Sequence, residues 1–315
     1  MSGEASEAMR AVRVHGYGET PRVERVVRPE PAPGEALVRV LATVVTHLDL
    51  TVCSGRFVVR PALPHTPGVE ALGEVIQSES DTIVKPGTRV LIDSCVGLDR
   101  PGAWAEYVTA PADDITPVDD RADVAQLADA SPAGTAHQAL FGAGAYRPGQ
   151  HVAVTGATGA CGLLTVALAA QHRGSGKVIA CVRSERRRDL LPADVTVLLD
   201  APDAPLDLLI DFVGGEGLQR RLGWLRPGGR AVLVGYTAGE AATLDLPNLL
   251  ALGVTLVAFN GMTAPPAPQT GSSTPSLPDL PYELIELEQI PQGCRRLRDG
   301  ETDGRLIAVV AADQL

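Results

Sequence analysis

Short alternating runs of apolar and polar residues dominate the first 125 or so positions of the chain. Valine alternates with arginine or glutamate in AVRVHGY (11–17) and in VERVVRPEPAPGEALVRVLATVVT (23–46), and the prolines and glycine at 29–34 predict a turn. Further short strands are expected at about 73–77, 89–92 and 104–109. A period of two is typical of strands with one buried face. This region is therefore predicted to form an antiparallel, barrel-like β domain.

The pattern changes near residue 122. An alanine-rich, helix-compatible stretch (123–145) is followed by apolar runs separated by helical segments. The runs are HVAVTG (151–156), KVIACV (177–182), VTVLLD (195–200), LDLLIDFVG (206–214), RAVLVG (230–235) and VTLVAF (254–259). Nearly continuous apolar strands that alternate with helices are typical of a parallel sheet covered on both faces. We therefore expect a second domain of α/β class.

The last part of the chain returns to a different pattern. Residues 263–281 contain six prolines and are predicted to be an irregular loop. A helix (PQGCRRLRDG, 291–300) and a final strand (RLIAVVA, 305–311) are expected after it.

Composition excludes several classes of partner. The 27 basic and 38 acidic side chains give a net charge of −11, whereas binding to nucleic acid or to an anionic membrane surface favours a basic protein. No stretch approaches the roughly 20 apolar residues of a membrane span, and the first ten residues lack the apolar core of a secretory signal. Five scattered cysteines, without a C-x-x-C pair, suggest reduced thiols. We expect a cytoplasmic protein that acts on a small molecule.

Residues 151–173 carry the strongest chemical signal. The strand at 151–155 leads into Gly156, Gly159 and Gly162, and an apolar, alanine-rich helix follows. A dinucleotide pyrophosphate binds to such a loop because the helix N-terminus offers free N–H groups and glycines allow close approach. The alternative is a turn whose glycines serve packing alone. The predicted contacts in this loop are Gly156, Thr158, Gly159, Ala160, Cys161 and Gly162.

A cluster of arginines indicates which dinucleotide would bind. Arg183 lies 21 residues after Gly162, where NAD-binding chains usually carry an acidic residue for the ribose hydroxyl. Arginine instead makes charge-assisted bonds to a 2′-phosphate. We therefore predict NADPH, selected by Arg183, Ser184 and Arg187, the alternative being a solvated helix face. Two later apolar runs, in 208–215 and 230–236, also end in loops at the carboxyl edge of the sheet, where nucleotides bind. The predicted contacts in these loops are Val213, Gly214, Gly235 and Tyr236. The alternative is that these loops are ordinary turns.

The order of motifs resembles the medium-chain dehydrogenase/reductase superfamily, in its zinc-free quinone oxidoreductase-like (ζ-crystallin-type) branch. The segments that carry the resemblance span nearly the whole chain: 9–19, 33–50, 64–75, 85–91, 102–111, 156–162, 209–215, 225–235 and 295–310. The resemblance implies a GroES-like β-barrel domain (1–127 and 261–315) and an inserted Rossmann domain (128–260) with a doubly wound parallel sheet. It also implies a nicotinamide cofactor in the cleft between the domains, and homodimers joined through Rossmann sheets.

The resemblance also bears on metal binding and on the reacting groups. Zinc-dependent relatives have ligands where this chain has Thr46, Val69 and, nearby, Ser131, none of which binds zinc as thiolate or imidazole. We therefore predict no metal. Thr46 and Thr51 replace the asparagine and tyrosine of many relatives, and Thr135 stands where relatives contact the nicotinamide. Thr46, Thr51 and His47 are the candidate catalytic donors, the alternatives being a plain strand residue for Thr46 and a surface histidine for His47.

These expectations lead to one principal hypothesis. The chain is predicted to be a zinc-independent, NADPH-dependent reductase of an enone, a quinone or another activated double bond, with a natural-product intermediate among the substrates considered. Such acceptors suit a metal-free site because the charge that develops on oxygen is delocalised, and hydrogen-bond donors can stabilise it. The alternatives are a non-redox enzyme, such as a cyclase or lyase, and a cofactor-binding protein without catalysis.

Overall fold

The computed structural model describes residues 7–79, 84–93, 96–261 and 277–311. The chain divides into two compact units, one formed by residues 1–131 and 280–315 and the other by residues 132–279. The sequence predicts domain boundaries at 127/128 and 260/261. The first lies close to the observed boundary at 131/132, and the second lies well before the observed boundary at 279/280. Most of the proline-rich segment predicted as a loop, residues 262–276, lies outside the described residues.

The first unit is built around one long strand, β3 (Glu35–Val45). It pairs along one edge with β4, and along the other with β6 in its first half and β15 in its second half. The sheet order is β14-β15-β3-β4-β5-β7, with β6 attached to β3, and β1 and β2 form a separate hairpin. The other strands are β1 (Ala8–Arg13), β2 (Arg22–Val27), β4 (Glu70–Ser78), β5 (Arg89–Asp93), β6 (Tyr107–Pro111), β7 (Ile115–Pro117), β14 (Tyr282–Glu286) and β15 (Arg305–Val309).

The C-terminal segment completes this unit. β15 pairs antiparallel with β3, and α6 (Ile290–Asp299) packs beside α1 (His47–Cys53) over a shared apolar core. The strand β14, parallel to β15, was missed in the sequence. It is a short edge strand whose side chains are largely exposed, so no apolar face distinguishes it from the preceding loop.

The second unit is a six-stranded, fully parallel sheet in the order β10-β9-β8-β11-β12-β13. Counted from the first strand of the unit, this is the order 3-2-1-4-5-6 of a doubly wound dinucleotide-binding fold. The strands are β8 (Val152–Thr155), β9 (Val178–Cys181), β10 (Thr196–Leu198), β11 (Leu206–Asp211), β12 (Leu225–Leu233) and β13 (Thr255–Ala258). The predicted α/β class and parallel sheet are confirmed.

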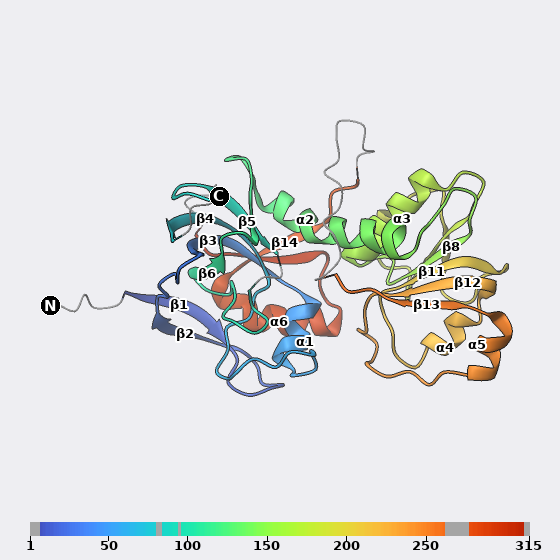
Figure 1. The fold of residues 1–315 in the computed structure, drawn as a ribbon, viewed down its shortest axis with the longest axis horizontal. Coiled ribbons are helices and arrows are strands. Elements are labelled where there is room, and N and C mark those ends of the chain that lie inside the picture. The colour runs from blue at the N-terminus through green and yellow to red at the C-terminus, as the bar shows by residue number, and fades with distance from the viewer. Residues whose placement is uncertain (1–6, 80–83, 94–95, 262–276, 312–315) are drawn as a thin grey trace. The chain divides into compact units, whose positions relative to one another are not determined.

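Helices cover the two faces of this sheet unequally. Figure 1 shows α3 (Ala160–His172) on one side, and α4 (Leu218–Leu222) and α5 (Leu246–Leu252) on the other. The link from β9 to β10 contains only the three-residue 3₁₀ turn η2 (Arg188–Leu190), and no helix lies between β10 and β11. The chain between β9 and β11 therefore carries no α-helix.

One helix runs across the boundary between the two units. α2 (Val124–His137) contains Pro132 and continues into a π-helical segment, η1 (Gln138–Ala143). A further 3₁₀ turn, η3 (Leu287–Gln289), precedes α6. Within the described residues, no helix has the length and apolar character needed to span a bilayer.

Candidate functional site

The predicted cofactor residues that follow β8, β9, β11 and β12 lie at one edge of the parallel sheet, the edge formed by the carboxyl ends of its strands. The strand order reverses between β8 and β11, so the loops that follow these two strands diverge at a topological switch point. A Cβ on Gly156, after β8, would lie 3.3 Å from the Cγ1 atom of Val213, after β11. The next loop along, after β12, contributes Gly235 and Tyr236. Ligands of open α/β sheets bind at this kind of position.

The glycine loop has the shape that close approach of a pyrophosphate requires. Gly156 has a φ of +59°, and the N–H of Gly159 donates to the Gly156 carbonyl at 2.9 Å. A Cβ on Gly162 would lie 2.1 Å from that same carbonyl oxygen, so only glycine fits where α3 meets the loop. Gly159 caps α3 without any side-chain hydrogen bond, which leaves the first backbone N–H groups of the helix available to an anion.

The loops after β11 and β12 fit against each other backbone to backbone. Gly214 and Gly215 have φ values of +60° and +69°. A Cβ on Gly214 would lie 2.9 Å from the Gly235 carbonyl oxygen, and one on Gly235 would lie 2.4 Å from that of Phe212. These glycines are therefore required by geometry, whatever their role in binding.

Asp211, which the sequence analysis did not select, organises this edge. Its side chain is fully buried, and its Oδ1 atom accepts hydrogen bonds from Thr155 Oγ1 (3.0 Å), Val213 N (2.9 Å) and Gly214 N (3.0 Å). The signal available in the sequence is a carboxylate at the end of an apolar strand, three residues before the pair Gly214 and Gly215.

The arginines expected to select the 2′-phosphate lie just beyond β9. Arg183 and Ser184 are exposed, and no hydrogen bond or ion pair joins either side chain to another described residue. Arg187 is half-buried with a φ of +65°, and Arg188 forms an ion pair with Glu185 at 2.8 Å. The free guanidinium of Arg183 is therefore the group of this cluster best placed to meet a ligand.

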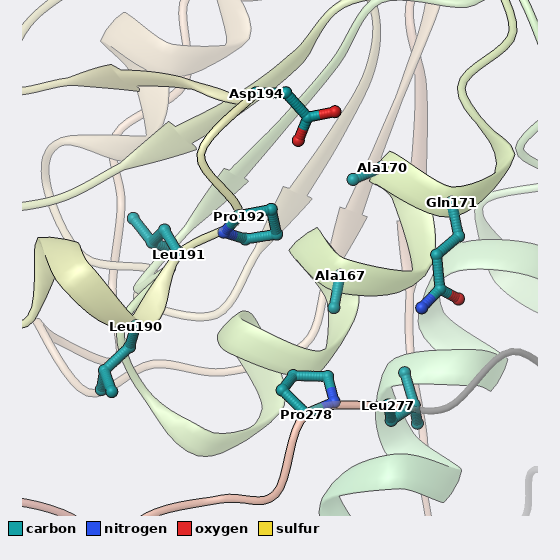
Figure 2. Close-up of a pocket in the computed structure, with 9 residues that line it drawn as sticks. All are labelled: Ala167, Ala170, Gln171, Leu190, Leu191, Pro192, Asp194, Leu277 and Pro278. Atoms are coloured by element: carbon teal, nitrogen blue, oxygen red, sulfur yellow. The ribbon is translucent and has the colours of Figure 1, made fainter.

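The cavity found in this unit lies away from the predicted residues. It measures about 520 Å³ and is lined by α3, by the segment 190–194 and by Leu277 and Pro278 (Figure 2). It lies beside α3 where the shortened β9–β10 link supplies no helix. Because its lining is mostly apolar and carries none of the predicted site residues, we assign the candidate site to the sheet edge instead.

In the first unit, Thr46 and Asp49 form a reciprocal cap at the start of α1. Asp49 N donates to Thr46 Oγ1 at 3.1 Å, while Asp49 Oδ2 accepts from Thr46 N (2.8 Å) and Thr46 Oγ1 (2.7 Å). Thr51, which is buried, donates its hydroxyl proton to the His47 carbonyl at 2.8 Å. The hydroxyl protons of both threonines, which are candidate catalytic donors, are thus donated to other groups of the protein in this structure.

Asp49 fixes the position of this helix. Its Oδ1 atom accepts from Gly68 N (3.0 Å) and Val69 N (3.1 Å), so the carboxylate joins α1 to the segment before β4. Burial raises the pKa of Asp49 to about 6, against the opposing effect of these hydrogen bonds. Asp49 therefore has a structural role, because it caps α1 and joins it to the segment before β4.

The remaining predicted residues are less closely linked. His47 is exposed in the first turn of α1, and Thr135 is half-exposed in the part of α2 that belongs to the second unit. Among the residues that the structure describes, no group of three or more His, Cys, Asp or Glu side chains is arranged to hold a metal ion.

Comparison with known proteins agrees with this architecture. Residues 32–120 match the alcohol dehydrogenase GroES-like domain. The chain is 32% identical over 249 residues to the quinone oxidoreductase of Mus musculus, covering 72% of this chain and 73% of that protein. It is 26% identical to an alcohol dehydrogenase of Geobacillus stearothermophilus, covering 97% of this chain and all of that protein.

Solved structures show the same fold. The mycobacterial protein Rv1454c, complexed with NADPH, superimposes with a TM-score of 0.79 at 22% identity, covering 96% of this chain and 99% of the other. An alcohol dehydrogenase from Pyrobaculum aerophilum gives 0.76 at 24% identity, covering 96% and 100%. With a GroES-like domain, a Rossmann sheet and this degree of identity to a quinone oxidoreductase, the chain belongs to the quinone oxidoreductase-like proteins of the medium-chain dehydrogenase/reductase superfamily.

Proposed function

We propose that this protein is a zinc-independent, NADPH-dependent oxidoreductase that transfers hydride to an enone, a quinone or another activated double bond. The observation that carries the proposal is the glycine loop at the switch point of the parallel sheet, where Gly162 lets α3 approach the Gly156 carbonyl and no side chain caps the helix N-terminus. The 32% identity to a mammalian quinone oxidoreductase supports the class of acceptor.

The residues of the sheet edge fit a nicotinamide dinucleotide. The N–H groups at the start of α3 and the glycine loop would hold the pyrophosphate, and the loops after β11 and β12 would line the adjoining surface. When bound, the reduced cofactor supplies the hydride; the protein orients it and limits access of water. The exposed, unpaired Arg183 with Ser184 supports a 2′-phosphate, and hence NADPH.

The first unit supports metal-free chemistry. Thr46 and Val69 stand where zinc-dependent relatives have ligands, and Thr46 is engaged with Asp49. Of the three proposed donors, Thr46, His47 and Thr51, His47 is the one with an exposed side chain. A histidine can donate a hydrogen bond or a proton to a developing oxyanion near neutral pH, and a delocalised enolate or hydroquinone anion needs less stabilisation than a simple alkoxide.

NADPH oxidation with a panel of quinones and enones tests the proposal. We expect stoichiometric consumption of NADPH with at least one acceptor and no loss of activity after treatment with a metal chelator. Tight NADPH binding with no acceptor reduced would favour the alternatives, a non-redox enzyme or a cofactor-binding protein. Loss of activity on chelation would contradict zinc independence.

Replacing Arg183 with alanine is expected to reduce kcat/KM for NADPH by about 10- to 100-fold, the effect of losing charge-assisted hydrogen bonds to a phosphate. The value for NADH should stay within about twofold, because NADH lacks that phosphate. Arg188→Ala is the matched control, since Arg188 is exposed but pairs with Glu185. Steady-state kinetics with both cofactors measure the effect, and an equal loss for NADPH and NADH would refute the role of Arg183.

We also propose that the protein is a homodimer joined through the second unit. β13 is the edge strand of the parallel sheet, and nearby α5 has no fully buried side chain, with Leu246 and Leu250 61% and 82% exposed. Unpaired strand edges and exposed apolar side chains favour association with a second copy. Leu250→Glu should shift the mass measured by light scattering from dimer to monomer, and a monomeric wild-type protein would contradict the proposal.

A cytoplasmic location is proposed as well. Three of the described cysteines, Cys53, Cys181 and Cys294, are free thiols. Free thiols are typical of a reducing compartment. Fractionation of the native host with an antibody to the protein would test the assignment, and recovery outside the cytoplasm would reject it.

A further inference from the structure

A buried ion pair lies behind the loop that follows β11. Arg221, in α4, donates from Nε to Asp211 Oδ2 at 2.7 Å. The Asp211 side chain is fully buried, and that of Arg221 is only 11% exposed. Burying both charges costs solvation free energy, and an apolar pair of the same size would often stabilise the fold as well. The pair therefore calls for an explanation other than stability.

Arg221 holds the loop at a second point. Its Nη2 atom donates to the Gly214 carbonyl oxygen at 2.6 Å. Asp211 meanwhile accepts from the N–H groups of Val213 and Gly214 through its other oxygen. The Gly214 residue is thus fixed on both its N–H and its carbonyl side, and Arg221 is the group that joins these two contacts.

The same network reaches the end of β8, next to the glycine loop. The Thr155 hydroxyl donates to Asp211 Oδ1 at 3.0 Å and accepts from Phe212 N at 3.0 Å. Thr155 directly precedes Gly156, whose Cβ position would lie 3.3 Å from Val213. The end of β8, the loop after β11 and the helix α4 are therefore all bonded to one buried carboxylate.

The surrounding geometry leaves little freedom for the loop. A Cβ on Gly215 would lie 2.7 Å from the Ala238 carbonyl oxygen, and Gly214 is similarly close to Gly235. A displacement of Gly214 would therefore displace the loop after β12 as well. Every predicted cofactor contact after β11 and β12 depends on this arrangement.

We propose that Arg221 is a positioning residue which, through Asp211 and the Gly214 carbonyl, holds the loops of the sheet edge in the shape that binds the dinucleotide. The inference rests on the proposed function, since it assumes a dinucleotide at this edge. Arg221 is not expected to select between the two nicotinamide cofactors, because it bonds to the loop after β11, whereas the arginines proposed to bind the 2′-phosphate follow β9.

The test compares Arg221→Met with Arg220→Met. Arg220 is the adjacent residue of α4, 66% exposed, with its guanidinium 3.4 Å from exposed Asp200. We expect Arg221→Met to raise the dissociation constants of both NADPH and NADH about tenfold or more in calorimetric titration. Arg220→Met should leave both unchanged. In kinetics, KM for NADPH should rise while kcat at saturating NADPH changes little, a split that general destabilisation does not produce.

A second variant separates binding from folding. In Asp211→Asn/Arg221→Met the buried charge is removed, while the asparagine oxygen can still accept from Thr155, Val213 and Gly214. We expect its melting temperature to recover relative to Arg221→Met while its affinity stays low, because the Gly214 carbonyl still lacks Arg221. If folded Arg221→Met binds both cofactors as tightly as Arg220→Met does, the inference is overturned and the proposed function is not. The same holds if the double variant regains its cofactor affinity together with its melting temperature. A wild-type protein that binds neither cofactor would overturn the proposed function and this inference with it.

Discussion

Replacing Arg305 with methionine is expected to lower the free energy of unfolding by about 3–5 kcal/mol, the cost of leaving one member of a buried ion pair uncompensated. Arg305, in β15, donates from Nη2 to Glu70 in β4 at 2.5 Å, and both side chains are 9% exposed. Arg305 also donates to the Ala128 carbonyl at 3.1 Å. The variant would therefore loosen the C-terminal strand from both β4 and α2.

The effect should depend on pH. Burial, with Asp93 and Asp49 nearby, raises the pKa of Glu70 from 4.5 to about 7, although Arg305 opposes the shift. Between these values the folded protein keeps a proton that the unfolded chain has lost, so the contribution of Glu70 to stability is most favourable below pH 4.5 and falls as the pH rises through 7. Without Arg305, burying the ionised carboxylate of Glu70 costs still more free energy. Urea unfolding followed by the fluorescence of buried Trp104 should show a larger loss at pH 8 than at pH 5.

Two controls make this result specific. Glu70→Met/Arg305→Met removes both charges and should recover most of the stability lost. Arg22→Met removes a guanidinium that is 69% exposed and 3.8 Å from Glu19, and should cost less than about 1 kcal/mol. A loss below about 1 kcal/mol for Arg305→Met at pH 8 would mean that Glu70 reaches solvent in the folded protein.

Local pattern in the sequence was sufficient to predict most of the fold. The apolar runs ending at Thr155, Cys181 and Asp211 become adjacent parallel strands because burial on both faces leaves a continuous apolar signature. The glycines at 156, 159 and 162 were recognised because their spacing follows from backbone contacts within a single turn. By contrast, β14 carries no such signature, since its side chains lie largely at the surface.

Long-range polar pairs could not be predicted in the same way. Glu70 and Arg305 are 235 positions apart, and Thr155 and Asp211 are 56 apart, so no local spacing connects them. Thr46 shows a related limit. Its residue type is compatible with a hydrogen bond to a ligand, but the Asp49 carboxylate three residues later already accepts its proton. Whether a polar side chain is available to a ligand depends on neighbours that only the folded structure supplies.

Gly162→Ala is expected to reduce the affinity for NADPH by at least about 100-fold, the scale of effect that a shift of about 1 Å in a positioned group produces. The added Cβ would lie 2.1 Å from the Gly156 carbonyl oxygen and 3.0 Å from the Ala157 Cα. Both are backbone atoms that cannot rotate away, so the glycine loop and α3 must separate. Overpacking of this kind also costs about 1–3 kcal/mol of stability.

Gly134→Ala is the matched control for the stability effect. Gly134 lies in α2, has no positive φ, and a Cβ there would meet no atom within 4 Å. Alanine at this helical position should stabilise the protein by roughly 0.5–1 kcal/mol. Thermal unfolding should therefore show a loss of stability for Gly162→Ala and a gain for Gly134→Ala. Calorimetric titration should show a large loss of NADPH affinity for Gly162→Ala alone. Unchanged NADPH affinity in a folded Gly162→Ala protein would show that the loop between β8 and α3 does not contact the dinucleotide, because the substitution cannot be accommodated without moving that loop.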